Sequence, residues 1–174
     1  ALLGGNKGDY SIINPNDDVN CSQSTNDVIP TAGKMTSLRL LKNLKHELLQ
    51  LHSALCKKAE EFNDVIKMGR TQLQDAVPIR LGQEFRAYSV AIMRDIHRME
   101  KAMGEMRTLN LGGTAVGTGL NADEAYLHRI VPILSEVSDM DLAQAYDLID
   151  ATQNLDVFVA VSGAVKACAV TLSK

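Results

Sequence analysis

Hydrophobic residues recur at helical spacing along two long stretches of the chain. Within residues 30–62, leucines follow one another at alternating steps of three and four residues, at Leu41, Leu44, Leu48, Leu51 and Leu55. This spacing places the side chains on one face of an α-helix. The pattern therefore predicts a long helix with a buried face.

A second stripe predicts another long helix, from Pro78 to about Leu109. Proline presets the backbone φ for a first helical turn, and Asp75 is a possible cap. The apolar positions are Ile92, Met93, Ile96, Met99, Met103 and Met106. The charged positions expected on the opposite face are Arg94, Asp95, Arg98, Glu100 and Lys101. Both stripes are typical of core packing.

Two shorter helices are predicted from capping-box spacing. Asn121 precedes Glu124 by three residues, and Asp150 stands in the same relation to Gln153. Pro132 should kink or divide the first of these helices. Because no stretch alternates apolar and polar residues, we expect no strand. The predicted fold class is all-α, a bundle of long helices.

Polar and glycine-rich segments separate the helices. Residues 1–31 are rich in Gly, Asn, Asp, Ser and Thr, and residues 68–78 form a second polar loop. The run from Leu111 to Leu120 contains four glycines, which free the backbone to adopt positive φ. It is not a phosphate-binding loop, because it follows no strand and lacks a Gly-Lys-Ser/Thr ending.

Composition narrows the classes of protein. A net charge of −3 with interspersed signs leaves no basic stripe for nucleic acid or membrane, and no apolar run approaches the roughly 20 residues of a membrane span. The sequence indicates a soluble, cytoplasmic protein whose three cysteines are reduced thiols. The four histidines lack partners at metal-ligand spacing, so we assign them no metal or catalytic role: His46, His52, His97 and His128.

Two polar clusters lie directly before predicted helices. Ser24, Thr25 and Asn26, followed by Asp27, would offer hydroxyl, amide and backbone donors to an anion at the positive end of a helix. Residues 69–78 hold a similar position before the second helix. On physics alone, helix capping and a turn explain both clusters better than a ligand site does.

Three motifs taken together resemble the aspartase/fumarase superfamily over essentially the whole chain. They are Asn14 to Asn20 with Ser22 to Asp27, then Met68 to Pro78, and finally Leu111 to Asn121. Fumarases usually carry His where this chain has Asn14 and Gln72. The resemblance is therefore closer to the aspartase branch, and residues 74–78 and 83–87 strengthen that choice.

The resemblance implies a reaction and a site. It implies reversible elimination of ammonia from L-aspartate to give fumarate, through an aci-carboxylate intermediate and with no metal or organic cofactor. Ser24, Thr25 and Asn26 would hold the β-carboxylate, while Thr71 and Gln72 would hold the α-carboxylate and orient the amine. A second dicarboxylate site known from fumarases matches Asn14, Asn16 and Asp17.

The resemblance also predicts what these residues do not supply. The family's flexible Gly-Ser-Ser-x-Met-Pro-x-Lys-x-Asn loop, which carries the serine base, has no counterpart here and is expected beyond Lys174. We therefore expect an internal fragment, catalytically silent alone. Residues 1–31 would close an N-terminal domain that carries the first motif, and residues 32–174 would belong to the central helical bundle.

The resemblance implies a homotetramer in which three subunits build each site. The two predicted helices, each on the order of 45 Å long, also favour an oligomer. Two alternatives stay open: a fragment of a fumarase-type hydratase, and a non-catalytic helical oligomerisation module whose stripes bind partner helices.

Overall fold

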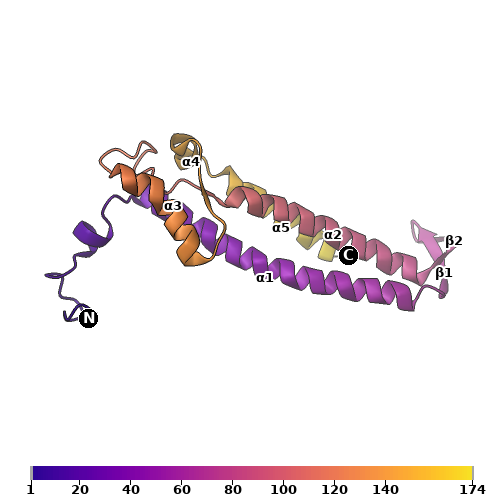
Figure 1. The fold of residues 1–174 in the computed structure, drawn as a ribbon. Coiled ribbons are helices and arrows are strands. Elements are labelled where there is room, and N and C mark those ends of the chain that lie inside the picture. The colour runs from indigo at the N-terminus through magenta and orange to yellow at the C-terminus, as the bar shows by residue number, and fades with distance from the viewer. Residues whose placement is uncertain (1, 174) are drawn as a thin grey trace. The chain divides into compact units, whose positions relative to one another are not determined.

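The computed structural model describes residues 2–173 and divides into two compact units (Figure 1). The first unit comprises the chain up to Thr36 together with Arg107–Leu155, and the second comprises Ser37–Met106 together with the chain from Asp156. Helix α1 (Thr25–Glu61) contributes residues to both. The domain boundary expected between residues 31 and 32 stays a prediction.

The second unit is built from three long helices around an aliphatic core. Helix α2 (Leu81–Met106) packs against α5 (Asp156–Leu172) and against the later turns of α1. The buried residues of this core come from all three helices: Leu41, Leu48, Ile92, Ile96, Met99, Ala102, Ala164 and Cys168. Both predicted stripes are confirmed as core-facing, except that Leu51 remains 37% exposed.

Asp95 corrects the predicted polar face of α2. The sequence pattern placed it among solvated charges, but its side chain is fully buried and pairs with Arg98. The buried arc of α2 is wider than one stripe, because α1 and α5 both cover it. Burial raises the pKa of the Cys168 thiol, and the negative charge of Asp95 raises it further.

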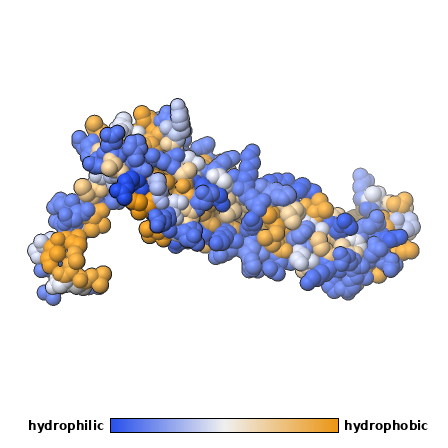
Figure 2. All heavy atoms as spheres, viewed as in Figure 1, coloured by the Kyte–Doolittle hydropathy of each residue, from blue (hydrophilic) through white to orange (hydrophobic). Residues whose placement is uncertain are grey.

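A β-hairpin occupies the segment that was predicted to be loop. Strand β1 (Ile66–Thr71) pairs antiparallel with β2 (Gln74–Arg80), and α2 begins only at Leu81. The expectations of no strand and of a helix start at Pro78 were wrong. Most hairpin side chains are exposed, so neither face required alternating apolar residues. Ile66 of β1 is 75% exposed. Figure 2 shows hydrophobic patches that interrupt the polar surface at the hairpin end.

The first unit surrounds the start of α1 with short elements. It contains a π-helical turn (Pro15–Val19), α3 (Glu124–Ser138) and α4 (Leu148–Gln153). Two strands of two residues each, β3 (Thr108–Leu109) and β4 (Ala143–Gln144), pair in parallel. Helix α3 continues through Pro132, so that proline does not divide it.

The caps of α3 and α4 differ from those predicted. The carboxylate of Asp123 accepts from the second and third N–H groups beyond it, and Asp147 does the same for α4. Asn121 has a φ of 65°, whereas an N-cap residue needs an extended backbone, and Asp150 already lies inside α4. Both predicted capping boxes were therefore wrong.

The expected fold class is confirmed, since long helices dominate and the strands are short. Between residues 2 and 173, no helix combines the length and the apolar character needed to cross a lipid bilayer.

Replacing Leu48 by alanine should destabilise the second unit. Leu48 is 3% exposed within the three-helix core, so Leu48→Ala should cost about 2 to 5 kcal/mol of unfolding free energy. Leu40→Ala, on the same helix but 64% exposed, should cost less than about 0.5 kcal/mol. Urea unfolding followed by circular dichroism checks the pair, and equal losses would contradict the assigned core.

Candidate functional site

The first predicted cluster lies at the N-terminus of α1, where Ser24 and Asp27 cap the helix reciprocally. Ser24 Oγ accepts from the Asn26 N–H at 3.2 Å, and the Ser24 N–H donates to Asp27 Oδ1 at 3.0 Å. Capping by this cluster is thus confirmed. Thr25 and Asn26 are exposed at the same helix end, so capping by Ser24 and Asp27 leaves the Thr25 side chain open to solvent.

Asp27 also binds the glycine-rich loop to the helix. Its side chain is fully buried, and Oδ2 accepts from the N–H groups of Gly112 at 3.2 Å and Thr114 at 3.0 Å. A buried carboxylate is costly unless hydrogen bonds compensate it. Three backbone donors from two separate segments supply that compensation, so Asp27 holds these segments together.

Asn110 and Asn26 add two further bonds between the same segments. Asn110 is fully buried, and its Nδ2 donates to the backbone oxygen of Asn26 at 2.9 Å and to Thr152 Oγ1 at 3.2 Å. Asn26 Nδ2 donates in turn to the backbone oxygen of Ala115 at 2.7 Å. None of the sequence patterns singled out Asn110, although a polar residue between Leu109 and Leu111 is a usable signal for a buried hydrogen bond.

The glycine-rich loop owes its composition to close packing. Gly117 has a φ of +90°, and a Cβ there would lie 2.4 Å from the Cα of Ile149. A Cβ on Gly119, whose φ is +65°, would lie 2.9 Å from the Leu127 side chain. The glycines let this loop pass against α3 and α4. The expectation that no strand precedes the loop was wrong, because β3 ends at Leu109, whereas the loop does lack a Gly-Lys-Ser/Thr ending.

The second predicted cluster lies at the tip of the hairpin, in the second unit. Gln72 and Leu73 form the two-residue turn, and both have positive φ, at 48° and 65°. Such turns favour Asn and Gly, so these side chains are held in a conformation they rarely adopt. Thr71 and Gln72 are both exposed.

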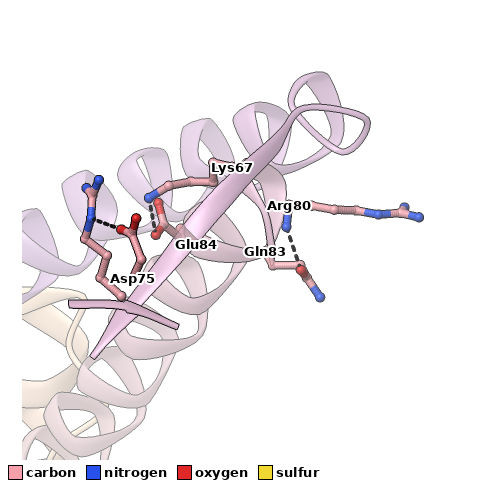
Figure 3. A network of polar contacts seen from close by, with 6 residues as sticks. Lys67, Asp75, Arg80, Gln83 and Glu84 are labelled. Carbon is pink, nitrogen blue, oxygen red and sulfur yellow. Dashed lines mark hydrogen bonds and ion pairs between the residues drawn. The ribbon is translucent and has the colours of Figure 1, made fainter. Parts of the chain in front are cut away.

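Ion pairs brace this hairpin (Figure 3). Arg70 Nε lies 3.0 Å from Asp75 Oδ1 across the two strands, and Lys67 Nζ lies 2.7 Å from Glu84 Oε1 of α2. Because these groups are part-exposed, each pair contributes little free energy, but together they limit the orientations open to the tip. The hairpin belongs to a different unit from Ser24, Thr25 and Asn26.

The third predicted cluster lies at the π-helical turn. Asn14 Oδ1 accepts from the N–H groups of Asn16 at 2.8 Å and Asp17 at 3.2 Å, and therefore caps this turn. Asn16 and Asp17 are exposed. A second dicarboxylate site formed by these residues stays a prediction.

The described residues offer no evident metal centre. From residue 2 to residue 173, no three His, Cys, Asp or Glu side chains gather in a group that could hold a metal ion. His46, His97 and His128 are exposed, and His52 Nδ1 lies 3.0 Å from the backbone oxygen of Ser89.

Tyr126 of α3 is the titratable group with a shifted pKa beside Asp27. Burial raises the pKa of its phenol, and the negative charges of Asp27 and Cys21 raise it further. Among the described residues its hydroxyl is buried without a hydrogen-bond partner. The neutral phenol is therefore the form that the fold favours.

Comparison with known proteins identifies the family. The model of a family described as lyase matches residues 2–174. The chain belongs to this lyase family. The resemblance of its three motifs to the aspartase/fumarase superfamily is thereby confirmed.

Curated relatives of this lyase chain share about half of its residues in identical positions. The aspartate ammonia-lyase of Bacillus subtilis (strain 168) is 50% identical over 173 residues, and that of Escherichia coli (strain K12) is 44% identical over 173 residues. Each comparison covers 99% of this chain but 36% of the relative. The lyase chain thus spans about a third of the length of these proteins.

Solved structures agree with this assignment. A fumarate lyase/delta crystallin from Brucella melitensis shares 46% identity with a TM-score of 0.95, covering 99% of this chain and 37% of that one. A class II fumarase from Schistosoma mansoni shares 30% identity with a TM-score of 0.90, covering 98% of this chain and 39% of that one. Both support the long-helix fold.

Tyr126 should make stability fall at alkaline pH. A raised folded-state pKa adds stability that is complete below the ordinary tyrosine pKa and is lost as pH rises through the folded value, so the loss begins above about pH 10. Tyr126→Phe should reduce this loss and, by removing a buried unpartnered hydroxyl, leave stability at pH 7 unchanged or higher by about 1 kcal/mol. Urea unfolding of each variant at pH 7 and above about pH 10 checks this prediction. Tyr146→Phe, at an exposed tyrosine, is the control. A parallel response of the two variants would contradict the assignment.

Proposed function

We propose that the full-length protein is an aspartate ammonia-lyase, which eliminates ammonia from L-aspartate to give fumarate. The observation that carries this proposal is the joint presence of two features. The chain is 50% identical to an aspartate ammonia-lyase over 173 residues, and exposed hydroxyl and amide side chains lie at the N-terminus of its longest helix.

The chemical difficulty lies at Cβ, whose proton is weakly acidic. Removing that proton leaves two negative charges on the β-carboxylate, as an aci-carboxylate, before the C–N bond breaks and ammonia leaves with its electron pair. Donors that strengthen as this charge develops lower the barrier. Ser24, Thr25 and Asn26 are the residues of this chain proposed to supply them, aided by the dipole of α1.

The geometry at α1 supports different shares for these three residues. Thr25 is exposed, and Ser24 and Asp27 cap the helix in its place, so the Thr25 hydroxyl is the most available donor. Ser24 Oγ already accepts from the Asn26 N–H, but its own proton can still be donated. Asn26 uses one proton of Nδ2 to bind the backbone oxygen of Ala115, so in our proposal its second amide proton serves the substrate.

The proposal assigns the other carboxylate and the amine to Thr71 and Gln72. Their exposure at the tip of a braced hairpin supports a role toward a ligand outside their own unit. We propose that the complete site combines segments from three copies in a homotetramer. The base that removes the Cβ proton is assigned to the serine of the family's flexible loop, expected beyond Lys174.

Removing the Thr25 hydroxyl should slow the elimination. In the full-length protein, Thr25→Ala should lower kcat by roughly a hundredfold, because one donor to the developing charge is lost. Thr36→Ala, at an exposed threonine of the same helix, should leave kcat unchanged. Fumarate absorbance in the ultraviolet measures both rates. A Thr25→Ala rate within about threefold of the unaltered protein would contradict the role. Hydration of fumarate without deamination of aspartate would instead indicate a fumarase.

Residues 1–174 alone should form no fumarate from L-aspartate. In our proposal these residues carry donors for the substrate, but the proton-removing serine lies outside them. The same absorbance assay on the purified 174-residue chain and on the full-length protein checks this. Turnover by the shorter chain would show that its own residues include a base.

A further inference from the structure

Pro30 leaves a carbonyl near the start of α1 without its helical donor. In an α-helix the N–H of residue 30 would donate to the backbone oxygen of Asn26, but proline has no N–H, and its ring pushes that carbonyl outward. A proline in the sixth position of a helix therefore exposes one backbone acceptor. The exposed carbonyl belongs to the residue that directly follows Thr25.

Asn110 supplies the donor that Pro30 lacks. Its Nδ2 donates to the Asn26 oxygen at 2.9 Å, across 84 residues of sequence, from a fully buried position. The bond from the same Nδ2 to Thr152 Oγ1 fixes which side of the carboxamide faces α1. Within the described chain, Asn110 Oδ1 has no hydrogen-bond partner. Asparagine at this position therefore satisfies the Asn26 carbonyl but leaves one buried oxygen of its own unpaired, a cost that a purely packing residue would avoid.

We propose that Asn110 is a positioning residue for the dicarboxylate site, an inference that rests on the proposed function. Its carboxamide takes over the hydrogen bond that Pro30 removes, and so fixes the peptide plane of Asn26. That plane joins the Cα atoms of Asn26 and Asp27, so it sets the direction of the Asn26 side chain and of its amide donors. Asn110 itself is buried and does not touch the substrate.

Neighbouring contacts explain why one bond matters. The Asn26 side chain reaches Ala115 at 2.7 Å, and Asp27 holds the N–H groups of Gly112 and Thr114. These bonds fix the loop side of the cluster, while the Asn110 bond fixes the carbonyl side of Asn26. Without it, the Asn26 carbonyl would turn toward solvent and carry the donors away from a charge that develops at one place.

The first measurement uses Asn110→Leu in the full-length protein. We expect kcat for aspartate deamination to fall roughly ten- to hundredfold, whereas KM should change by less than about threefold. The melting temperature should fall only slightly, since leucine preserves volume and removes the unpartnered oxygen while it leaves the Asn26 carbonyl without its donor. Rates are expressed per folded protein recovered by gel filtration. An unchanged kcat would overturn the proposal.

The decisive measurement is a rescue by a second substitution. Pro30→Ala restores an N–H that can donate to the Asn26 oxygen. The double variant Pro30→Ala with Asn110→Leu should therefore have a kcat roughly fivefold to tenfold higher than Asn110→Leu alone. Pro30→Ala alone should remain near the unaltered rate. If the leucine variant does not fold, Asn110→Ala with and without Pro30→Ala replaces it.

A matched stabilising variant separates positioning from stability. Gly104→Ala lies in α2, where an added methyl meets no described atom within 4 Å, and alanine should stabilise that helix. Combined with Asn110→Leu it should not restore kcat. Equal rescue by Gly104→Ala, or no rescue by Pro30→Ala, would overturn the role of Asn110. Absence of deamination in the unaltered full-length protein would overturn the proposed function itself, and this inference with it.

Discussion

The buried carboxylate of Asp27 is the constraint on which the first unit depends. An ionised group that is fully removed from water must be compensated, and here the N–H groups of Ser24, Gly112 and Thr114 do so. Satisfying one charge therefore joins the start of α1 to a loop 85 residues later in the chain. The shape of the glycine-rich loop follows from this, because its backbone donors must converge on one oxygen while the loop passes close to α4.

This arrangement has an electrostatic consequence for the proposed lyase. An uncompensated negative charge near the proposed dicarboxylate site would repel the carboxylates of the substrate. Three backbone dipoles point at Asp27 and spread that charge, while Ser24, Thr25 and Asn26 present neutral donors at the positive end of α1. The site can then favour the extra charge of an aci-carboxylate through oriented hydrogen bonds. In the proposed site orientation matters more than net charge, and for this reason we propose that a buried residue such as Asn110 affects the rate.

The second unit depends on a different interaction, the burial of aliphatic side chains between three helices. Leu48, Ile96 and Met99 make that core, and few aromatic residues are needed. At one end the hairpin holds Gln72 and Leu73 with positive φ, and Leu73 is 92% exposed. A two-residue turn of this kind suits a hairpin, but glutamine and leucine are unfavourable in it because both residues must adopt positive φ. Its cost is consistent with a function at the hairpin tip, in line with the role proposed for Thr71 and Gln72.

The sequence by itself determined the two long helices, their core residues and, through three ordered motifs, the lyase family. Helical periodicity and capping chemistry are local, so residues such as Leu48 or Ser24 could be assigned from their neighbours in the chain. Only the tertiary structure decided the burial of Asp95, the pairing of β1 with β2, and the bonds of Asp27 and Asn110. Each of these depends on a partner that folding brings close: a third helix over α2, a second exposed strand with no alternating pattern, and a loop more than 80 residues away from the helix it holds. Pro30 carried a readable signal, a missing N–H inside a helix, but the donor that replaces it could be named only once the chain had folded.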